Sequence, residues 1–137
     1  MVTRDSADTL PLALTVSDCS VPGFPLVYVN RKFTEVTGYD KKDCEGRNCR
    51  FLQGPGTNPE HGQHLLDTLR EGQDSQTMLL NYRKSGEPFE NLLTMAYVPD
   101  SLGRRRFCIA RTCMTSARER KSRRDMHVHV HAQLYIR

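Results

Sequence analysis

The segment GRNCRFLQGPGT (residues 46–57) places one cysteine among polar side chains that are suited to holding a ligand. Asn48 and Arg50 flank Cys49, and Gln53 follows four residues later. Residues four apart share one face of a helical turn, so Cys49 and Gln53 are expected side by side. The chemistry that this segment offers is that of a thiol inside a polar cradle.

Two asparagines further along the chain form a second polar set. If residues 85–87 make a three-residue hairpin loop, Asn81 lies directly opposite Asn91 on one face of a sheet. A two-residue loop would instead pair Asn81 with Glu90 and place the two asparagines on opposite faces. Two adjacent amides suit a planar heterocycle whose edge alternates C=O and N–H groups. Polar residues on a solvated sheet face are the alternative interpretation.

The remaining cysteines and histidines do not indicate an enzyme or a metal site. The chain has five cysteines and no C-x-x-C spacing, so neither a disulfide framework nor a zinc ribbon is predicted. Four of them are expected to be ordinary packing residues: Cys19, Cys44, Cys108 and Cys113. No histidine stands in a strong spacing relation to Cys49, which argues against a cysteine-dependent enzyme. His127, His129 and His131 alternate without a carboxylate partner, so no metal is predicted.

Charge is concentrated at the C-terminal end. The chain has 137 residues, 37% of them apolar, and a net charge of +4. Six basic and two acidic residues from position 116 onward account for the whole excess. A basic segment such as 116–124 is most often a solvated end, and contact with nucleic acid or an acidic membrane surface is the alternative. No apolar run is long enough for a membrane span or a signal peptide, so we expect a soluble cytoplasmic or nuclear protein.

Hydrophobic patterning and turn residues predict one α+β domain. A helix is expected from Pro59 to Glu71, with Asn58 as N-cap, and shorter helical stretches are expected within residues 31–46. Strands are predicted over residues 10–18, 26–30, 76–84, 89–99 and 105–114. These elements form a five-stranded domain over residues 10–115, between an N-terminal tail (1–9) and the basic C-terminal tail (116–137).

The segment GRNCRFLQGPGTN (46–58) resembles the signature of LOV (light-oxygen-voltage) domains, the flavin-binding branch of the PAS family. TGY (37–39) and NYRKSGEPFEN (81–91) match other segments of that family, and the resemblance covers residues 10–115. It implies the PAS fold, a five-stranded antiparallel sheet with short helices packed on one face. It also implies a blue-light photoreceptor domain rather than an enzyme.

The resemblance assigns a role to each polar residue. Cys49 would form a reversible, light-induced bond with the C4a carbon of a flavin that is bound non-covalently in the dark. Asn81 and Asn91 would hold the pyrimidine edge of the flavin ring. Asn48 and Gln53 would contact its ribityl chain. Arg50 would pair with the phosphate of flavin mononucleotide (FMN), for which its planar guanidinium is suited.

Two departures from the family pattern change these expectations. Leu66 and Gln63 stand where the family usually carries further phosphate-binding arginines, so riboflavin should compete better than usual. The loop before the helix has no insertion that would admit the adenine dinucleotide, FAD. We therefore rank FMN first, riboflavin second and FAD third. Thr112 occupies the last-strand position of a flavin-contacting glutamine, and its shorter side chain predicts a weaker or rerouted signal relay.

The sequence leaves the output of such a domain open. Signalling would pass through the tail, through self-association as a homodimer, or through a protein effector. The alternative is a flavin-free PAS interaction module of the potassium-channel type, in which Cys49 is only a packing residue.

Overall fold

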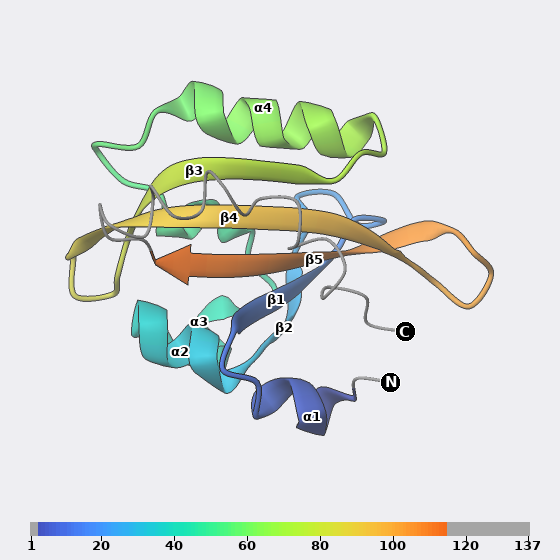
Figure 1. Ribbon diagram of the computed structural model, residues 1–137, viewed down its shortest axis with the longest axis horizontal. Coiled ribbons are helices and arrows are strands. Elements are labelled where there is room, and N and C mark those ends of the chain that lie inside the picture. The colour runs from blue at the N-terminus through green and yellow to red at the C-terminus, as the bar shows by residue number, and fades with distance from the viewer. Residues whose placement is uncertain (1–2, 115–137) are drawn as a thin grey trace.

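A computed structural model describes residues 3–114 and shows an antiparallel sheet with helices on one of its faces (Figure 1). The five strands lie in the order β2-β1-β5-β4-β3. The strands are β1 (Ala13–Asp18), β2 (Leu26–Val29), β3 (Ser75–Tyr82), β4 (Pro88–Pro99) and β5 (Arg105–Met114). The helices are α1 (Arg4–Asp8), α2 (Arg31–Thr37), α3 (Lys41–Cys44), the 3-10 helix η1 (Cys49–Leu52) and α4 (Pro59–Arg70). The predicted five-stranded α+β architecture is confirmed.

The helix α4 begins at Pro59, as the sequence predicted, and ends at Arg70, one residue before the predicted end. The Asn58 side chain accepts a hydrogen bond from the Glu60 backbone N–H at the start of α4, where Pro59 is the first residue. Gly38 ends α2 in the left-handed conformation. Leu65 and Leu69 of α4 are buried against the sheet, which fixes the helix over the cavity described below.

The register between β3 and β4 differs from the predicted one. Asn81 pairs with Phe89, and Asn91 pairs with Leu79, so the two asparagines are diagonal neighbours and not directly opposite. The chain reverses one residue earlier than expected, because the Arg83 N–H still donates to the Glu87 carbonyl at 2.9 Å and Gly86 supplies the positive φ of the turn. The resulting shift of two residues keeps both asparagines on the same face.

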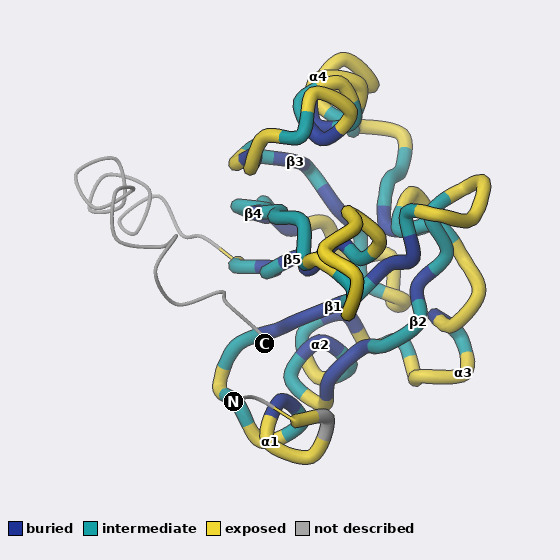
Figure 2. Tube along the Cα trace, turned by 90° about the vertical axis from the view of Figure 1, so that its right-hand side faces the viewer, coloured by how far each residue is buried: buried dark blue, intermediate teal, exposed yellow. Residues whose placement is uncertain are grey.

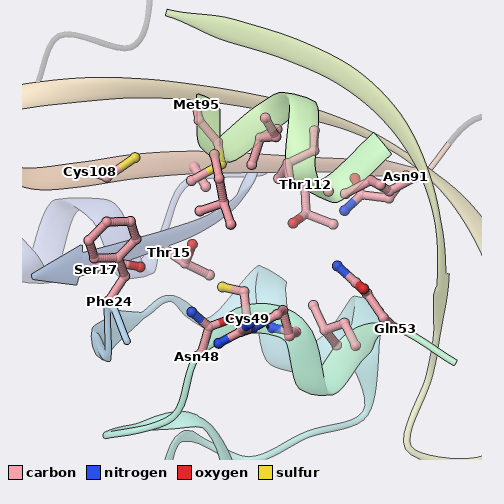
Figure 3. Close-up of a pocket in the computed structure, with 18 of the residues that line it drawn as sticks. Thr15, Ser17, Phe24, Asn48, Cys49, Gln53, Asn91, Met95, Cys108 and Thr112 are labelled. Carbon is pink, nitrogen blue, oxygen red and sulfur yellow. Dashed lines mark hydrogen bonds between the residues drawn. The ribbon is translucent and has the colours of Figure 1, made fainter. Parts of the chain in front are cut away.

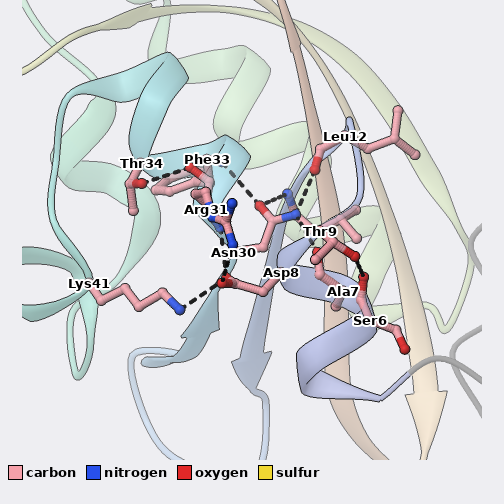
Figure 4. A network of polar contacts seen from close by, with 11 residues as sticks. Ser6, Ala7, Asp8, Thr9, Leu12, Asn30, Arg31, Phe33, Thr34 and Lys41 are labelled. Atoms are coloured by element: carbon pink, nitrogen blue, oxygen red, sulfur yellow. Dashed lines mark hydrogen bonds and ion pairs between the residues drawn. The ribbon is translucent and has the colours of Figure 1, made fainter.

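The N-terminal segment is not a simple tail, because residues 4–8 form the helix α1. A five-residue helix has too little periodicity to be predicted and needs tertiary contacts for its stability. The Asn30 side chain provides one such contact by donating to the Ala7 carbonyl at 2.9 Å (Figure 4). The Asp8 carboxylate provides others by accepting from the Arg31 N–H and from the Lys41 ammonium. These contacts attach α1 to α2 and to the start of α3.

Burial is greatest along the strands and the sides of the helices that face them (Figure 2). Within residues 3–114, no helix has the length and apolar composition needed to cross a bilayer. The basic segment 116–124 and the alternating histidines lie outside the described residues.

Candidate functional site

A cavity of about 260 Å³ lies between the sheet and the helices η1 and α4 (Figure 3). The volume is close to the lower end of the ~300–1,000 Å³ range of small-molecule sites. Every site residue predicted from the sequence lines this cavity: Asn48, Cys49, Arg50, Gln53, Asn81, Asn91 and Thr112. The cavity thus brings residues 48–53 together with residues of the strands β3, β4 and β5.

Cys49 is the first residue of η1, and its side chain points into the cavity toward Thr15 (Figure 3). The Asn48 side chain caps η1 by accepting from the Arg50 N–H at 2.8 Å. Burial raises the pKa of the Cys49 thiol to about 12, and the nearby Thr15 hydroxyl offsets only part of this rise. At neutral pH the Cys49 sulfur therefore carries its proton, so it needs activation before it can form a covalent bond.

The loop after η1 is fixed against β3. A Cβ at Gly54 would lie 2.5 Å from the Tyr82 ring, so only glycine allows this close approach. The Thr57 hydroxyl donates to the Leu80 carbonyl at 2.5 Å. These contacts position η1, and with it the Cys49 thiol, relative to the sheet.

Asn81 and Asn91 form a hydrogen-bonded pair at one end of the cavity. The Asn91 amide donates to the Asn81 side-chain oxygen at 2.9 Å, and the Asn91 oxygen accepts from the Cys113 N–H at 3.0 Å. The residues are 3% and 1% exposed. A side-chain amide has two N–H groups and two lone pairs, so each retains a donor and an acceptor for a ligand. Thr112, 6% exposed, lies on the inner face of β5 near Asn91. We call these three residues the amide end.

Three other lining residues lie at or near the surface: Arg50 and Gln63 are exposed, and Leu66 is half-buried. We call these three residues the mouth of the cavity. Arg50 is exposed, and its Nε donates to the Asn48 side-chain oxygen at 3.1 Å. Gln63 donates to the Asp67 carboxylate at 2.9 Å, and Leu66 is apolar. Among the described residues that line the cavity, Arg50 is the only charged one.

Several lining residues were not singled out from the sequence, among them Thr15, Ser17, Phe24 and Met95. Thr15 and Ser17 alternate along β1, so the period-two pattern of the predicted strand was a signal for their shared face. The Thr15 hydroxyl is fully buried and has no hydrogen-bond partner among the described residues. No local pattern marks Phe24, which lies in the turn after β1 with a φ of 48°.

Comparisons with known proteins give this site a context. The PAS domain family model matches residues 12–113. Phototropin-1A of Oryza sativa subsp. japonica is 45% identical over 101 residues, which is 74% of this chain but 11% of the phototropin. The solved LOV domain of a blue-light-activated histidine kinase from Erythrobacter litoralis is 37% identical with a TM-score of 0.74, covering 78% of this chain and 98% of that domain. A LOV domain studied with a flavin analogue is 35% identical with a TM-score of 0.78, covering 90% and 91% of the two chains.

The chain belongs to the PAS domain family and, within it, to the LOV domains. LOV domains are blue-light sensory modules with a flavin chromophore, as the resemblance of residues 46–58 implied. The chain spans about a tenth of the length of the phototropins that it matches.

The donors and acceptors in the cavity fit a flavin. The amide end offers a buried donor and acceptor from each asparagine, as the alternating C=O and N–H groups of a flavin pyrimidine edge require. The buried Thr15 hydroxyl lacks a partner, as expected where a polar ligand supplies one. Leu79, Leu93 and Met95 provide an apolar wall for the flat ring.

Proposed function

We propose that this chain is a blue-light sensor domain in which a flavin binds non-covalently and Cys49 forms a reversible covalent bond with it under light. The observation that carries the proposal is the position of the Cys49 thiol, which points into a cavity whose amide end offers the donors and acceptors that a flavin edge needs. Bound flavin would supply the absorption of blue light and, when excited, the ring carbon C4a that the sulfur attacks. The role of the chain is sensory and not catalytic.

The residues of the cavity would position the flavin ring, and burial would keep the Cys49 thiol protonated. Asn81 and Asn91, which are bonded to each other, would orient the ring through their remaining donors and acceptors, and the fixed loop after η1 would hold the Cys49 sulfur beside it. Because burial raises the pKa of the Cys49 thiol, a flavin bound in the dark would meet a protonated thiol and not a thiolate, which supports non-covalent binding in the dark.

FMN is our first choice of flavin, riboflavin the second and FAD the third. Arg50 supports FMN, since a guanidinium at the mouth can bind phosphate oxygens. Riboflavin ranks second because Gln63 and Leu66 add no further cation and Asp67, the partner of Gln63, is an acid. Asn48 and Gln53 would contact the ribityl chain between ring and phosphate.

The output of the domain is a further part of the proposal. Thr112 takes the place of a longer amide side chain beside the ring, which supports a weaker or rerouted relay through β5. We infer that the signal passes to the tail, to a second copy of the chain or to a protein effector. Contact with nucleic acid or an acidic membrane surface through residues 116–124, and a cytoplasmic or nuclear location, rest on the sequence alone.

The test is the visible absorption spectrum of the purified chain in the dark, after blue light and during dark recovery. We expect a structured flavin band that bleaches and returns. Cys49→Ala should keep the flavin but lose the bleaching. Cys44→Ala is the matched control, because Cys44 is buried close to Cys49 but does not line the cavity. Full bleaching of Cys49→Ala would refute the role of this thiol. A colourless wild-type chain that does not bind added flavin would favour the flavin-free interaction module.

A further inference from the structure

Two other cysteines, Cys19 and Cys108, meet at the cavity wall. Cys108 of β5 pairs with Ser17 of β1, and the Cys19 N–H donates to the Arg106 carbonyl at 2.7 Å. Cys19 is therefore offset from Cys108 by two residues and faces the same side of the sheet. Both side chains line the cavity, and both belong to the apolar cluster around Leu65 and Leu69.

The two thiols are in unlike environments. Cys108 is 1% exposed, whereas Cys19 is half-buried and can be reached by a small solute. Interaction with the neighbouring Cys108 side chain lowers the pKa of Cys19, and the same interaction together with burial raises the pKa of Cys108. An accessible thiol that ionises more readily, next to a second thiol, is the arrangement of a reactive and a resolving cysteine.

We propose that Cys19 and Cys108 form a redox-sensitive pair that closes to a disulfide when a peroxide oxidises Cys19. The Cys19 sulfur attacks one peroxide oxygen, the O–O bond breaks, and the other oxygen leaves as water, giving a sulfenic acid. The Cys108 sulfur then attacks the sulfenic sulfur, and the hydroxyl leaves with the Cys108 proton as a second water. Each cysteine loses one electron, and the peroxide gains two.

The position of Cys19 at the end of a strand makes this closure feasible and reversible. Diagonal neighbours in antiparallel strands have Cβ atoms up to about 7 Å apart, whereas a disulfide needs about 4 Å. Cys19 follows the last residue of β1, so the turn that it begins can supply this movement. A bond formed with such distortion is more readily reduced than a relaxed one, which suits a switch.

Closure would restrain the turn that covers one end of the cavity. This turn, residues 19–25, carries Phe24 into the cavity wall in a left-handed conformation that is strained for a phenylalanine. The turn is already attached by the Cys19 N–H, which donates to the Arg106 carbonyl, and by the Gly23 carbonyl, which accepts from the Asn48 side chain at 2.5 Å. A covalent bond from Cys19 to β5 would hold the turn closed more firmly than these hydrogen bonds, so the oxidised protein releases flavin more slowly. This consequence rests on the proposed function, but the disulfide does not.

The experiment treats the full chain, as purified, with hydrogen peroxide and counts free thiols by maleimide labelling and mass spectrometry. We expect the loss of two of the five free thiols, a mass lower by two hydrogen atoms, a cross-linked Cys19–Cys108 peptide and full recovery with dithiothreitol. Cys113→Ser, a change in a half-buried cysteine outside the cavity, should behave like the wild type.

Cys19→Ser should abolish the thiol loss, and it tests the pair even if a variant of the buried Cys108 does not fold. Unchanged thiol loss in Cys19→Ser, or oxidation that stops at Cys19 without a cross-link, would overturn the proposal. In the flavin-bound chain, release measured by free-flavin fluorescence should slow several-fold on oxidation, and an equal rate would overturn the effect on the turn. A chain that binds no flavin would contradict the proposed function, while the thiol count would still decide the disulfide.

Discussion

The amide end and the mouth of the cavity recognise a ligand by opposite means. At the amide end, Asn81 and Asn91 are almost completely buried and hydrogen-bonded to each other and to the backbone of β5. At the mouth, Arg50 is exposed to solvent and held by one side-chain contact, beside the apolar Leu66. A buried amide without its partner is costly, whereas an exposed charge remains solvated when no phosphate is present.

The difference indicates which part of a flavin determines affinity. In the proposed complex, the ring edge would meet groups that were removed from water during folding and that need a partner. A phosphate would meet a single cation that water already stabilises. We therefore expect binding to depend strongly on the ring and weakly on the phosphate, and the following predictions test that difference.

The largest effect is expected at the amide end. Asn91→Leu removes the proposed contacts to the ring and leaves the Cys113 N–H and the Asn81 oxygen without their partner. A loss of about 3 kcal/mol corresponds to roughly a hundredfold weaker flavin binding. Fluorescence titration of flavin into the apoprotein measures the change. Gln76→Leu, the same kind of substitution at an exposed position of β3, is the control and should bind flavin normally.

A smaller effect is expected at the mouth. Leu66→Arg adds a second cation where phosphate would lie, and one charge-assisted contact of about 1.5 kcal/mol would favour FMN over riboflavin roughly tenfold. Leu66→Gln controls for size without charge and should leave the preference unchanged. If Leu66→Arg also leaves the ratio of the two dissociation constants unchanged, the mouth does not bind the phosphate.

The pH dependence of the free energy of unfolding tests how well the Cys49 thiol is shielded from solvent. Cys49 has a folded-state pKa of about 12, above the ordinary value of 9.0, because burial disfavours the thiolate. The unfolded chain therefore loses this proton first, and stability falls as the pH rises from about 9 toward 12. Cys49→Ala should lose less stability than the wild type over this range in urea denaturation. Parallel curves for the two proteins would mean that the thiol is solvated.

The smallest effect concerns the relay at Thr112. Thr112→Gln places a longer amide at the amide end, where it can reach the ring. We expect a larger light-minus-dark difference in the amide hydrogen exchange of β5 than in the wild type. Thr112→Val, which keeps the shape and removes the hydroxyl, is the control. Equal differences in all three proteins would place the relay elsewhere.

The sequence was informative where structure is local. Asn58 with Pro59 marked the start of α4 because capping depends on a few neighbouring residues. The residues around Cys49 identified the family and its flavin chemistry, because they are contiguous in the chain. The helix α1 was missed, since its stability depends on contacts with Asn30 and Arg31, which are distant in sequence.

By itself, the sequence determined the order of elements from β1 onward, the family, and the set of polar residues that line one cavity. Only the tertiary structure decided the register that makes Asn81 and Asn91 diagonal, because the point of chain reversal depends on which turn packs best. Tertiary structure also decided that Cys19 meets Cys108, 89 residues later in the chain. Contacts at such separations follow from sheet pairing, which depends on the whole core and not on neighbouring residues.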